Sequence, residues 1–263
     1  MTQTLITVDV SQYPAEFYDL LTGAEKIYDS SCSPQAQVIF IQKDAGYFLK
    51  SAPKGMLERQ AIMTRYFNSI GLTAKVVSYI CDHDRDWLLA EQVKGDDCLA
   101  AKYLEQPERL VDTLAQQLLL LHDTDFSACP VQNHTELYLA SAKRNMQTGN
   151  YNKTDFPDSF GYKSAGEAWA VVESRGNLLQ CDTLLHGDYC LPNIMLDDWQ
   201  FSGFIDLDAG GVGDRHVDLF WGVWSLEYNF KTDKYRGRFL DAYGRSKVDE
   251  DMLQLVAAVE VFG

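Results

Sequence analysis

The stretch LHGDYCLPNIMLDDWQFSGFIDLD, residues 185–208, sets polar side chains at close intervals among apolar runs. The polar residues are His186, Asp188, Asn193, Asp206 and Asp208. The runs IML and FSGFI on either side of DDWQ predict an antiparallel hairpin. Its turn is expected between Trp199 and Gln200. Asn193 then lies opposite Asp206, because the two are equally far from the turn, and an amide and a carboxylate come together at the open end of the hairpin.

The oxygen atoms of Asn193 and Asp206 are ligands of the kind that Mg²⁺ prefers when it is held jointly with phosphate oxygens. Asp188 stands on the loop that leads into the first strand. A carboxylate near such a metal can take a proton from an attacking hydroxyl group, so Asp188 is the candidate base. The alternative for Asp188 is a turn cap before a strand. His186 is expected to position the loop by hydrogen bonding, and the set as a whole indicates phosphoryl transfer.

The first part of the chain predicts a small lobe of strands with one helix. The runs QVIFIQ and GYFLKS flank the turn KDAG, which predicts a hairpin. Residues 57–71 carry apolar side chains at helical spacing and end at Gly71. Residues 74–93 return to an alternation of apolar and polar side chains and predict two more strands joined by an acidic loop. We therefore expect an N-terminal lobe over residues 1–94, with a hinge near Glu91–Gly95.

The rest of the chain, residues 95–263, predicts a larger and mainly helical lobe. Pro107 stands where a first-turn proline belongs, and the helix that follows carries a leucine stripe. The stripe consists of Leu110, Leu114, Leu118 and Leu121. Further helices are expected over residues 135–148, 164–175, 216–229, 233–243 and 249–262. A chain of 263 residues can support two lobes with a substantial core, and a cleft between lobes is where ligands prefer to bind.

Composition excludes several classes of function. The chain has 23 basic and 38 acidic residues, a net charge of −15, which disfavours nucleic acid and anionic membranes and would attract a cationic partner. No apolar run approaches the roughly 20 residues that span a bilayer, and no secretory signal is visible. The six cysteines form no C-x-x-C pair, which favours reduced thiols in the cytoplasm over a zinc site or a disulfide framework.

The stretches HGDYCLPNIMLDD, GFIDLD and GVGDRHVDL together resemble the antibiotic-phosphotransferase family, most closely its aminoglycoside 3′-phosphotransferase branch. HGDYCLPN keeps the Asp-to-Asn interval of the protein-kinase catalytic loop, with Gly in place of Arg, and IDLD stands where D-F-G would. The resemblance covers nearly the whole chain. It implies an α+β, two-lobed protein-kinase-like fold with a small antiparallel-sheet N-terminal lobe and a larger helical C-terminal lobe.

The resemblance also implies a set of nucleotide-binding residues, which are Lys50, Glu58, Ser33, Phe48, Glu91 and Val93. Lys50 would contact the α- and β-phosphates and Glu58 would fix its ammonium group, although an exposed ion pair is the alternative. Ser33 belongs to the loop that would cover the phosphates. Phe48 would stack on adenine or else pack in the core, and Glu91 and Val93 would offer backbone groups to the base. The implied cofactors are Mg²⁺ and ATP, with GTP possible.

The substrate implied by the resemblance is an aminoglycoside, whose several ammonium groups need carboxylates in the protein. The matching acids are Asp155, Asp158, Glu227 and Glu260, with solvated surface acids as the alternative for the first two. Ala209 replaces an arginine that is usual in these enzymes. The expected partners are a small cationic substrate and a nucleotide, with no nucleic acid and no membrane, and the protein is expected to be a monomer or weak dimer.

The expected activity is transfer of the γ-phosphoryl group of ATP to a hydroxyl group, the 3′-hydroxyl, of an aminoglycoside, which confers resistance. The same motif serves kinases of choline, homoserine and macrolides, so these acceptors remain alternatives. A catalytically weak nucleotide-binding protein is another, with Ala209 as its first hint. Asp218 is expected to be structural, as a helix cap or a brace for the catalytic loop.

Overall fold

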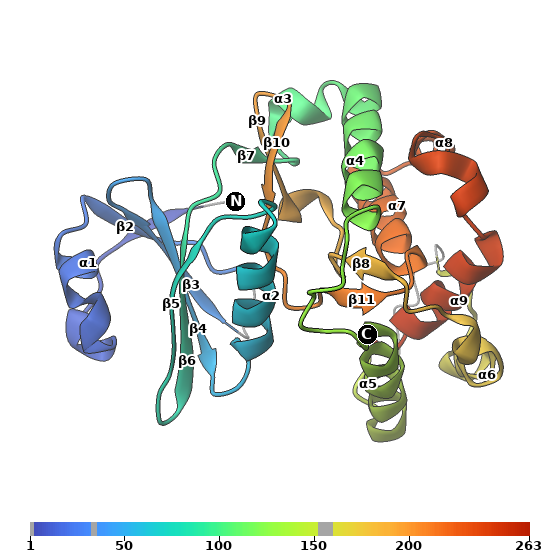
Figure 1. The fold of residues 1–263 in the computed structure, drawn as a ribbon, viewed down its shortest axis with the longest axis horizontal. Helices are drawn as coiled ribbons and strands as arrows, with labels where there is room; N and C mark the ends of the chain where they lie inside the picture. Colours follow the sequence, from blue (N-terminus) through green and yellow to red (C-terminus); the bar gives the residue numbers. More distant parts are fainter. Residues whose placement is uncertain (1–2, 33–35, 152–159) are drawn as a thin grey trace. The chain divides into compact units, whose positions relative to one another are not determined.

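The computed structural model describes residues 3–32, 36–151 and 160–263 (Figure 1). The chain divides into two compact units. Unit 1 comprises Met1–Lys94 and Ser202–Asp208, and unit 2 comprises Gly95–Phe201 and Ala209–Gly263. Each unit is described separately below.

Unit 1 is built on an antiparallel sheet with the strand order β1-β2-β3-β4-β6-β5. The strands are β1 (Thr4–Ile6), β2 (Lys26–Asp29), β3 (Gln37–Gln42), β4 (Tyr47–Pro53), β5 (Val76–Cys81) and β6 (Arg85–Glu91). The predicted hairpin is confirmed: Ile41 pairs with Tyr47 across the turn that contains Gly46. The predicted helix is α2 (Glu58–Ser69), and the two later strands are β5 and β6.

Alternation along β4 decides which side chains of unit 1 enter the core and which stay accessible. Leu49 points into a cluster with Ile39, Trp87 and the N-terminal Phe17 and Leu21. Figure 1 shows helix α1 (Tyr18–Thr22) on that face of the sheet and α2 on the other. The neighbours of Leu49 in sequence therefore point to the α2 side, because successive side chains of a strand face opposite ways.

Residues 202–208 group with unit 1, whereas the sequence had assigned them to the C-terminal lobe. The reason is local hydrogen bonding. Phe204 N donates to Leu72 O at 2.8 Å, and Thr73 Oγ1 donates to Phe204 O at 2.6 Å. Gly203 has Val93 Cγ1 at only 2.9 Å from the position that a Cβ would take, so a larger residue would prevent this approach.

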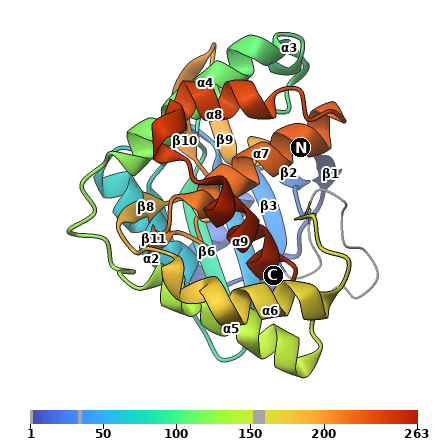
Figure 2. The same cartoon turned by 90° about the vertical axis from the view of Figure 1, so that its right-hand side faces the viewer.

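Unit 2 is mainly helical. Its helices are α3 (Ala101–Leu104), α4 (Pro107–His122), α5 (His134–Thr148), α6 (Ala165–Arg175), α7 (His216–Phe230), α8 (Arg236–Gly244) and α9 (Glu250–Glu260). The leucine stripe of α4 is buried, and α4 packs against α8 and α7. Helix α9 packs against α6 and α7 (Figure 2). The predicted cap of α9 is confirmed, since the Asp249 side chain accepts a hydrogen bond from Asp251 N.

Five short strands among the described residues flank or pair with the segments that lead into and out of residues 185–208. They are β7 (Asp96–Asp97), β8 (Thr183–Leu185), β9 (Ile194–Asp197), β10 (Gln200–Phe204) and β11 (Gly211–Gly213). β8 pairs with β11, and the order β10-β9-β7 forms a second small sheet. The described residues contain no helix with the length and apolar character that a bilayer span requires.

The predicted hairpin forms, but the position expected for its turn was wrong by one residue. Asp198 and Trp199 both have positive φ, 45° and 68°, and they connect β9 to β10 as a two-residue turn. Paired positive φ values are those of a type I′ turn, whose twist matches that of the flanking strands. With the turn centred between Asp198 and Trp199, Asn193 and Asp206 are no longer equally far from it, so strand register alone does not pair them.

Candidate active site

The loop between β8 and β9 carries the HGD sequence and is shaped by Gly187. Gly187 has φ +86°, a backbone conformation that favours glycine. A Cβ at this position would lie 2.2 Å from Ala209 O, a distance that only a backbone shift could relieve. The glycine therefore allows the chain to turn tightly between His186, which is fully buried, and Asp188, which is half-buried.

Asp218, on α7, holds this loop in place through hydrogen bonds to its backbone. Its carboxylate is fully buried and accepts hydrogen bonds from His186 N at 2.8 Å and Gly187 N at 2.7 Å. Burial alone would raise the pKa of Asp218, but the hydrogen bonds that it accepts from His122 and from the Gly187 amide help to lower it below its usual value. Asp218 therefore stays ionised and braces the loop that carries HGD, one of the two structural roles expected from the sequence.

His122, at the end of α4, connects Asp218 to a third helix. Its Nε2 lies 3.1 Å from Asp218 Oδ2, and its Nδ1 lies 2.8 Å from the Tyr243 hydroxyl of α8. An ionised carboxylate can only accept, so Nε2 carries the proton and Nδ1 accepts from Tyr243. Burial lowers the pKa of His122, which favours this neutral tautomer. The sequence analysis missed His122, although it continues the buried stripe four residues after Leu118.

Asp188 is fixed by Asn193, the last residue of the short helix that precedes β9. Asn193 Nδ2 donates to Asp188 Oδ2 at 2.8 Å and to Asp188 O at 3.0 Å. His186 Nδ1 accepts from Asp188 N at 3.2 Å, as expected for a residue that positions the loop. Because the Asn193 amide nitrogen is engaged, its Oδ1 atom is the one left to contact a cation.

Glu260, at the end of α9, lies near Asp188 within unit 2. Its Oε1 accepts from the Tyr138 hydroxyl at 2.7 Å and from Trp221 Nε1 at 3.1 Å. Burial raises the pKa of Glu260 to about 7; the two hydrogen bonds oppose this shift and the negative charge of Asp188 adds to it. A carboxyl group with this pKa changes its charge near neutral pH, beside the candidate base.

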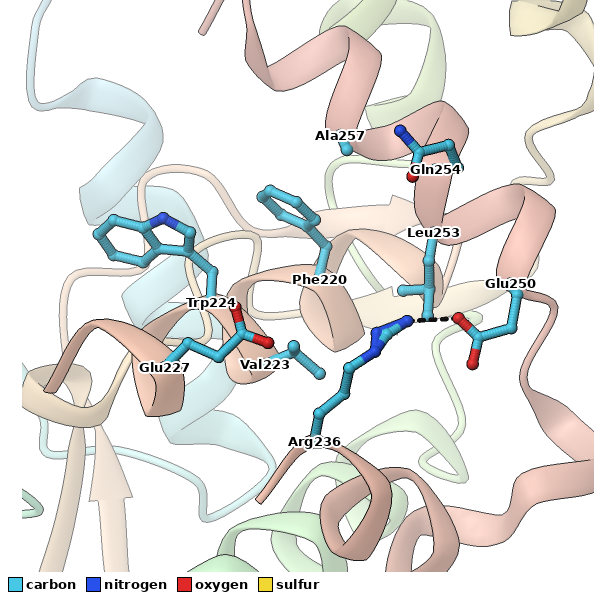
Figure 3. Close-up of a pocket in the computed structure, with 9 residues that line it drawn as sticks. All are labelled: Phe220, Val223, Trp224, Glu227, Arg236, Glu250, Leu253, Gln254 and Ala257. Carbon is cyan, nitrogen blue, oxygen red and sulfur yellow. Dashed lines mark hydrogen bonds and ion pairs between the residues drawn. The ribbon is translucent and has the colours of Figure 1, made fainter. Parts of the chain in front are cut away.

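Glu227, on α7, lines a pocket of about 100 Å³ (Figure 3). The other lining residues are Phe220, Val223, Trp224, Arg236, Glu250, Leu253, Gln254 and Ala257. Burial raises the pKa of Glu227, while Arg236 lowers it. Arg236 itself forms an ion pair with Glu250. Pockets that enclose drug-sized ligands measure roughly 300–1,000 Å³, so this one would hold a single substituent or ring.

Unit 1 contains a second polar cluster, made by Lys50, Gln60 and Asp206. Lys50 Nζ donates to Asp206 Oδ1 at 2.8 Å, and Gln60 Nε2 donates to the same oxygen at 3.1 Å. Asp206 has φ +58°, which aspartate tolerates better than most residues. Within the described residues the buried Gln60 Oε1 atom has no hydrogen-bond partner. Such an unsatisfied acceptor costs about 1–3 kcal/mol and calls for an explanation.

The sequence analysis expected Lys50 to pair with Glu58, but in the structure Lys50 pairs with Asp206. Glu58 is exposed on the first turn of α2, and the ion pair recorded for Lys50 among the described residues is with Asp206. The α2 side chain that reaches the cluster is Gln60. Two residues of a helix differ by about 200° around its axis, so Glu58 and Gln60 cannot face the same point.

The residues expected around the adenine base lie at the ends of β4 and β6. Phe48 is half-buried on the same face of β4 as Lys50, with its ring centre 5.0 Å from that of Phe40. Glu91 N donates to Lys75 O at 2.9 Å, so this amide is not available to a base, and a contact through the Glu91 carbonyl stays a prediction. For Val93 N no hydrogen bond is recorded to any described residue, so this amide could donate to a base.

The donor atoms fit a cation that is shared with phosphates. Nowhere in the described ranges do three His, Cys, Asp or Glu side chains gather as a metal-binding group. Mg²⁺ is commonly held by one or two protein ligands, with phosphate and water oxygens completing its shell. Asn193 and Asp206 offer two such oxygens from different units, and their sharing of one ion stays a prediction. Ser33, Asp155 and Asp158 lie outside the described residues.

Comparisons with known proteins agree on one family. A model of the phosphotransferase enzyme family matches residues 34–255. A probable aminoglycoside 3′-phosphotransferase of Lactococcus lactis is 48% identical over 258 residues, 98% of both chains. An aminoglycoside 3′-phosphotransferase of Niallia circulans is 29% identical over 255 residues, which are 95% of this chain and 97% of that one.

Solved structures share the fold. The crystal structure of an aminoglycoside-3′-phosphotransferase of type VIII matches with a TM-score of 0.73 at 22% identity, over 99% of this chain and 94% of that one. An aminoglycoside phosphotransferase of Streptomyces rimosus, in complex with ADP and streptomycin, matches with a TM-score of 0.75 at 19% identity, over 97% and 99%. The fold class expected from the sequence is confirmed. The chain belongs to the phosphotransferase enzyme family, on its aminoglycoside 3′-phosphotransferase branch.

Proposed function

We propose that the protein transfers the γ-phosphoryl group of ATP to the 3′-hydroxyl group of an aminoglycoside and thereby confers resistance. The observation that carries the proposal is the fixed position of Asp188. Its side chain is held by Asn193, and its loop is clamped by the buried carboxylate of Asp218. The 48% identity to a probable aminoglycoside 3′-phosphotransferase supports the choice of acceptor.

Unit 1 supplies the nucleotide contacts in this proposal. Phe48 offers an aromatic face to adenine, and the Val93 N–H and Glu91 carbonyl face its polar edge. Lys50 donates to the phosphates, and Ser33 belongs to the loop expected to cover them. GTP would be accepted only if the same backbone groups can pair with guanine.

Asn193 and Asp206 would hold Mg²⁺, which when bound neutralises charge on the phosphate oxygens. Asp206 lies 2.8 Å from the Lys50 ammonium, so the two groups that would face the phosphates already meet in unit 1. The usual arginine is replaced by Ala209, which removes one cation from this neighbourhood and is expected to lower nucleotide affinity.

Asp188 orients the acceptor hydroxyl group and removes its proton as the oxygen attacks phosphorus. The new bond joins the acceptor oxygen to the γ-phosphorus, the bond from that phosphorus to the β–γ bridging oxygen breaks, and ADP leaves. The proton stays on the Asp188 carboxyl group until solvent removes it. Most of the rate enhancement in phosphoryl transfer comes from positioning and charge neutralisation, which the fixed geometry of Asp188 favours.

Carboxylates of unit 2 would bind the ammonium groups of the acceptor. Glu260 is the strongest candidate because it lies near Asp188, and Glu227 offers a second charge in a pocket sized for one substituent. Asp155 and Asp158 remain sequence-based candidates. The six free thiols agree with a reducing compartment, and we place the reaction in the cytoplasm.

A coupled assay of nucleotide turnover tests the proposal. Purified protein is given ATP or GTP with Mg²⁺ and one acceptor at a time, from kanamycin, neomycin, a 3′-deoxy aminoglycoside, a macrolide and choline. Turnover with kanamycin and none with the 3′-deoxy compound is the expected result. Turnover with choline or the macrolide alone would replace the acceptor and retain the chemistry. No turnover with any acceptor would contradict the proposed activity.

A further inference from the structure

Helix α7 carries three aromatic side chains along one stripe, Trp221, Trp224 and Tyr228. At about 100° per residue, these positions fall within about 60° of one another around the helix axis. The ring centres of Trp221 and Trp224 are 5.3 Å apart with the planes at 82°, and those of Trp224 and Tyr228 are 4.9 Å apart with the planes at 14°. Tyr228, which is 57% exposed, therefore ends a continuous row of rings at the surface.

The stripe begins beside one acid of the proposed acceptor site and passes another. Trp221 Nε1 donates to Glu260 Oε1 at 3.1 Å, and Trp224 lines the pocket that also contains Glu227 (Figure 3). With a rise of about 1.5 Å per residue, Tyr228 lies about 10 Å along the helix axis from Trp221. An acceptor of several rings that is held at Glu260 can therefore bring a more distant ring to Tyr228.

The outer face of the Tyr228 ring, opposite Trp224, already holds a cation. Lys231 Nζ lies 4.1 Å from the ring centre, and it lies on this face because the stacked Trp224 ring covers the other one. Lys231 is exposed, and its ammonium group forms no ion pair with any described residue. Contacts between a cation and an exposed ring are weak, so a second ammonium group can replace Lys231.

We propose that the outer face of Tyr228 binds an ammonium group of the aminoglycoside acceptor, and that Lys231 occupies this position until the acceptor arrives. The inference rests on the proposed function and adds a subsite to it. An aromatic face attracts a cation without carrying a charge, so this subsite needs no carboxylate. Stacking against Trp224 holds the Tyr228 ring in a fixed orientation.

Lys231 makes the subsite selective. A neutral ring of an acceptor has no charge with which to replace the lysine ammonium group, whereas a ring that carries its own ammonium group can replace it. Lys231 stands at the end of α7 with φ +55°, and its long side chain can turn into solvent when it is displaced. The subsite therefore favours acceptors that carry an ammonium group on a ring distant from the reacting hydroxyl group.

The test is a double-mutant cycle on the KM for kanamycin at saturating ATP and Mg²⁺. Tyr228→Leu removes the aromatic face and is expected to raise this KM about two- to fivefold, with a smaller effect on kcat. Tyr228→Phe keeps an aromatic ring and should retain most of the affinity. Lys231→Met removes the competing ammonium group and should lower the KM about two- to fivefold.

Lys234→Met is the matched control. Lys234 Nζ lies 4.7 Å from the centre of the Tyr235 ring, which is buried, so this variant removes the same charge without freeing an exposed ring. General repulsion of a cationic acceptor by lysine affects both variants alike. The fall in KM should therefore be larger for Lys231→Met than for Lys234→Met, and the two should have equal effects in a Tyr228→Leu background. Thermal unfolding checks that each variant is folded.

The outcomes separate the subsite from the proposed function. Equal changes from Lys231→Met and Lys234→Met with Tyr228 present, or an unchanged KM in Tyr228→Leu, would overturn the subsite while wild-type turnover of kanamycin stands. If the wild-type protein does not turn over kanamycin at all, the proposed function fails and the inference fails with it.

Discussion

Asn193 donates its side-chain amide to both the carboxylate and the carbonyl oxygen of Asp188, at 2.8 and 3.0 Å. One residue thus fixes the rotamer of the candidate base and the backbone that carries it. The same amide presents its oxygen as a ligand for a cation. Because both functions depend on a single planar group, base and cation site are linked through Asn193.

Replacing Asn193 by Ala removes both functions at once. We expect kcat to fall by about a hundredfold or more, since a general base contributes roughly 10²–10⁴ and loses its orientation. The concentration of Mg²⁺ needed for half-maximal activity should rise as well. Steady-state kinetics over a Mg²⁺ series measure both effects, and a normal Mg²⁺ dependence in the variant would remove Asn193 from the cation site.

The role of Gly187 can be tested by comparison with Gly55, a glycine outside the HGD loop that has nearly the same φ. Both have φ near +85°, but a Cβ at Gly187 would lie 2.2 Å from Ala209 O, whereas a Cβ at Gly55 meets nothing within 4 Å. Gly55→Ala should cost about 1–2 kcal/mol from backbone conformation alone. Gly187→Ala should cost at least ~1 kcal/mol more and impair activity. Urea unfolding compares the two, and equal losses would show that the close approach to Ala209 is unimportant.

Asp218 is expected to support both the fold and the reaction. Asp218→Asn replaces one acceptor oxygen by an NH₂ group that faces either the Gly187 amide, in place of Oδ1, or the His186 amide and His122, in place of Oδ2. We expect a loss of about 3 kcal/mol in the free energy of unfolding, because hydrogen bonds to a buried charge are lost. Asp241→Asn, at an exposed ion pair with Arg245, is the control and should change stability by less than ~1 kcal/mol. A stable, fully active Asp218→Asn protein would contradict the brace.

The raised pKa of Glu260 should make the free energy of unfolding depend on pH. Its pKa is about 7 in the folded protein against a usual value of 4.5, so between these values the folded state binds the extra proton. Folding stability contributed by this group is therefore highest below pH 4.5 and declines as pH rises to about 7, by at most about 1.4 kcal/mol per pH unit. Glu260→Gln removes this slope. Urea unfolding of both proteins from pH 5 to 8 measures it, and parallel curves would contradict the raised pKa.

The same group should control the affinity for a cationic acceptor. As pH rises through about 7, Glu260 ionises and its attraction for an ammonium group increases. The KM for kanamycin should therefore fall across this range, and Glu260→Gln should abolish that fall with little change in the KM for ATP. A wild-type KM that does not change with pH would place the acceptor away from Glu260.

Much of the fold and of the catalytic loop could be predicted from the sequence because their signals are local. Alternation predicted the strands of unit 1, and the leucine stripe with Pro107 predicted α4. The spacing from Asp188 to Asn193 predicted that the two act together, and a hydrogen bond joins them. Hydrophobic periodicity and short spacings between residues can be recognised in a sequence without knowledge of tertiary contacts.

Other features depend on boundaries or on distant contacts. Glu58 was named and Gln60 was missed because the sequence does not fix where α2 begins, and a shift of two residues turns a helix face away. The hairpin turn was misplaced by one residue because Asp198 and Trp199 lack the glycine that usually marks positive φ. The link from His122 to Asp218 joins residues 96 positions apart, which no local pattern reveals.

The most direct test of the account is the Asp188→Asn variant, which keeps the shape of the side chain and removes its basicity. The account predicts that kcat with kanamycin falls by about 10³-fold or more, while the affinity for ADP with Mg²⁺ changes less than about twofold. A variant that retains kcat within about tenfold of wild type would show that Asp188 is not the base, since a general base contributes at least 10²-fold.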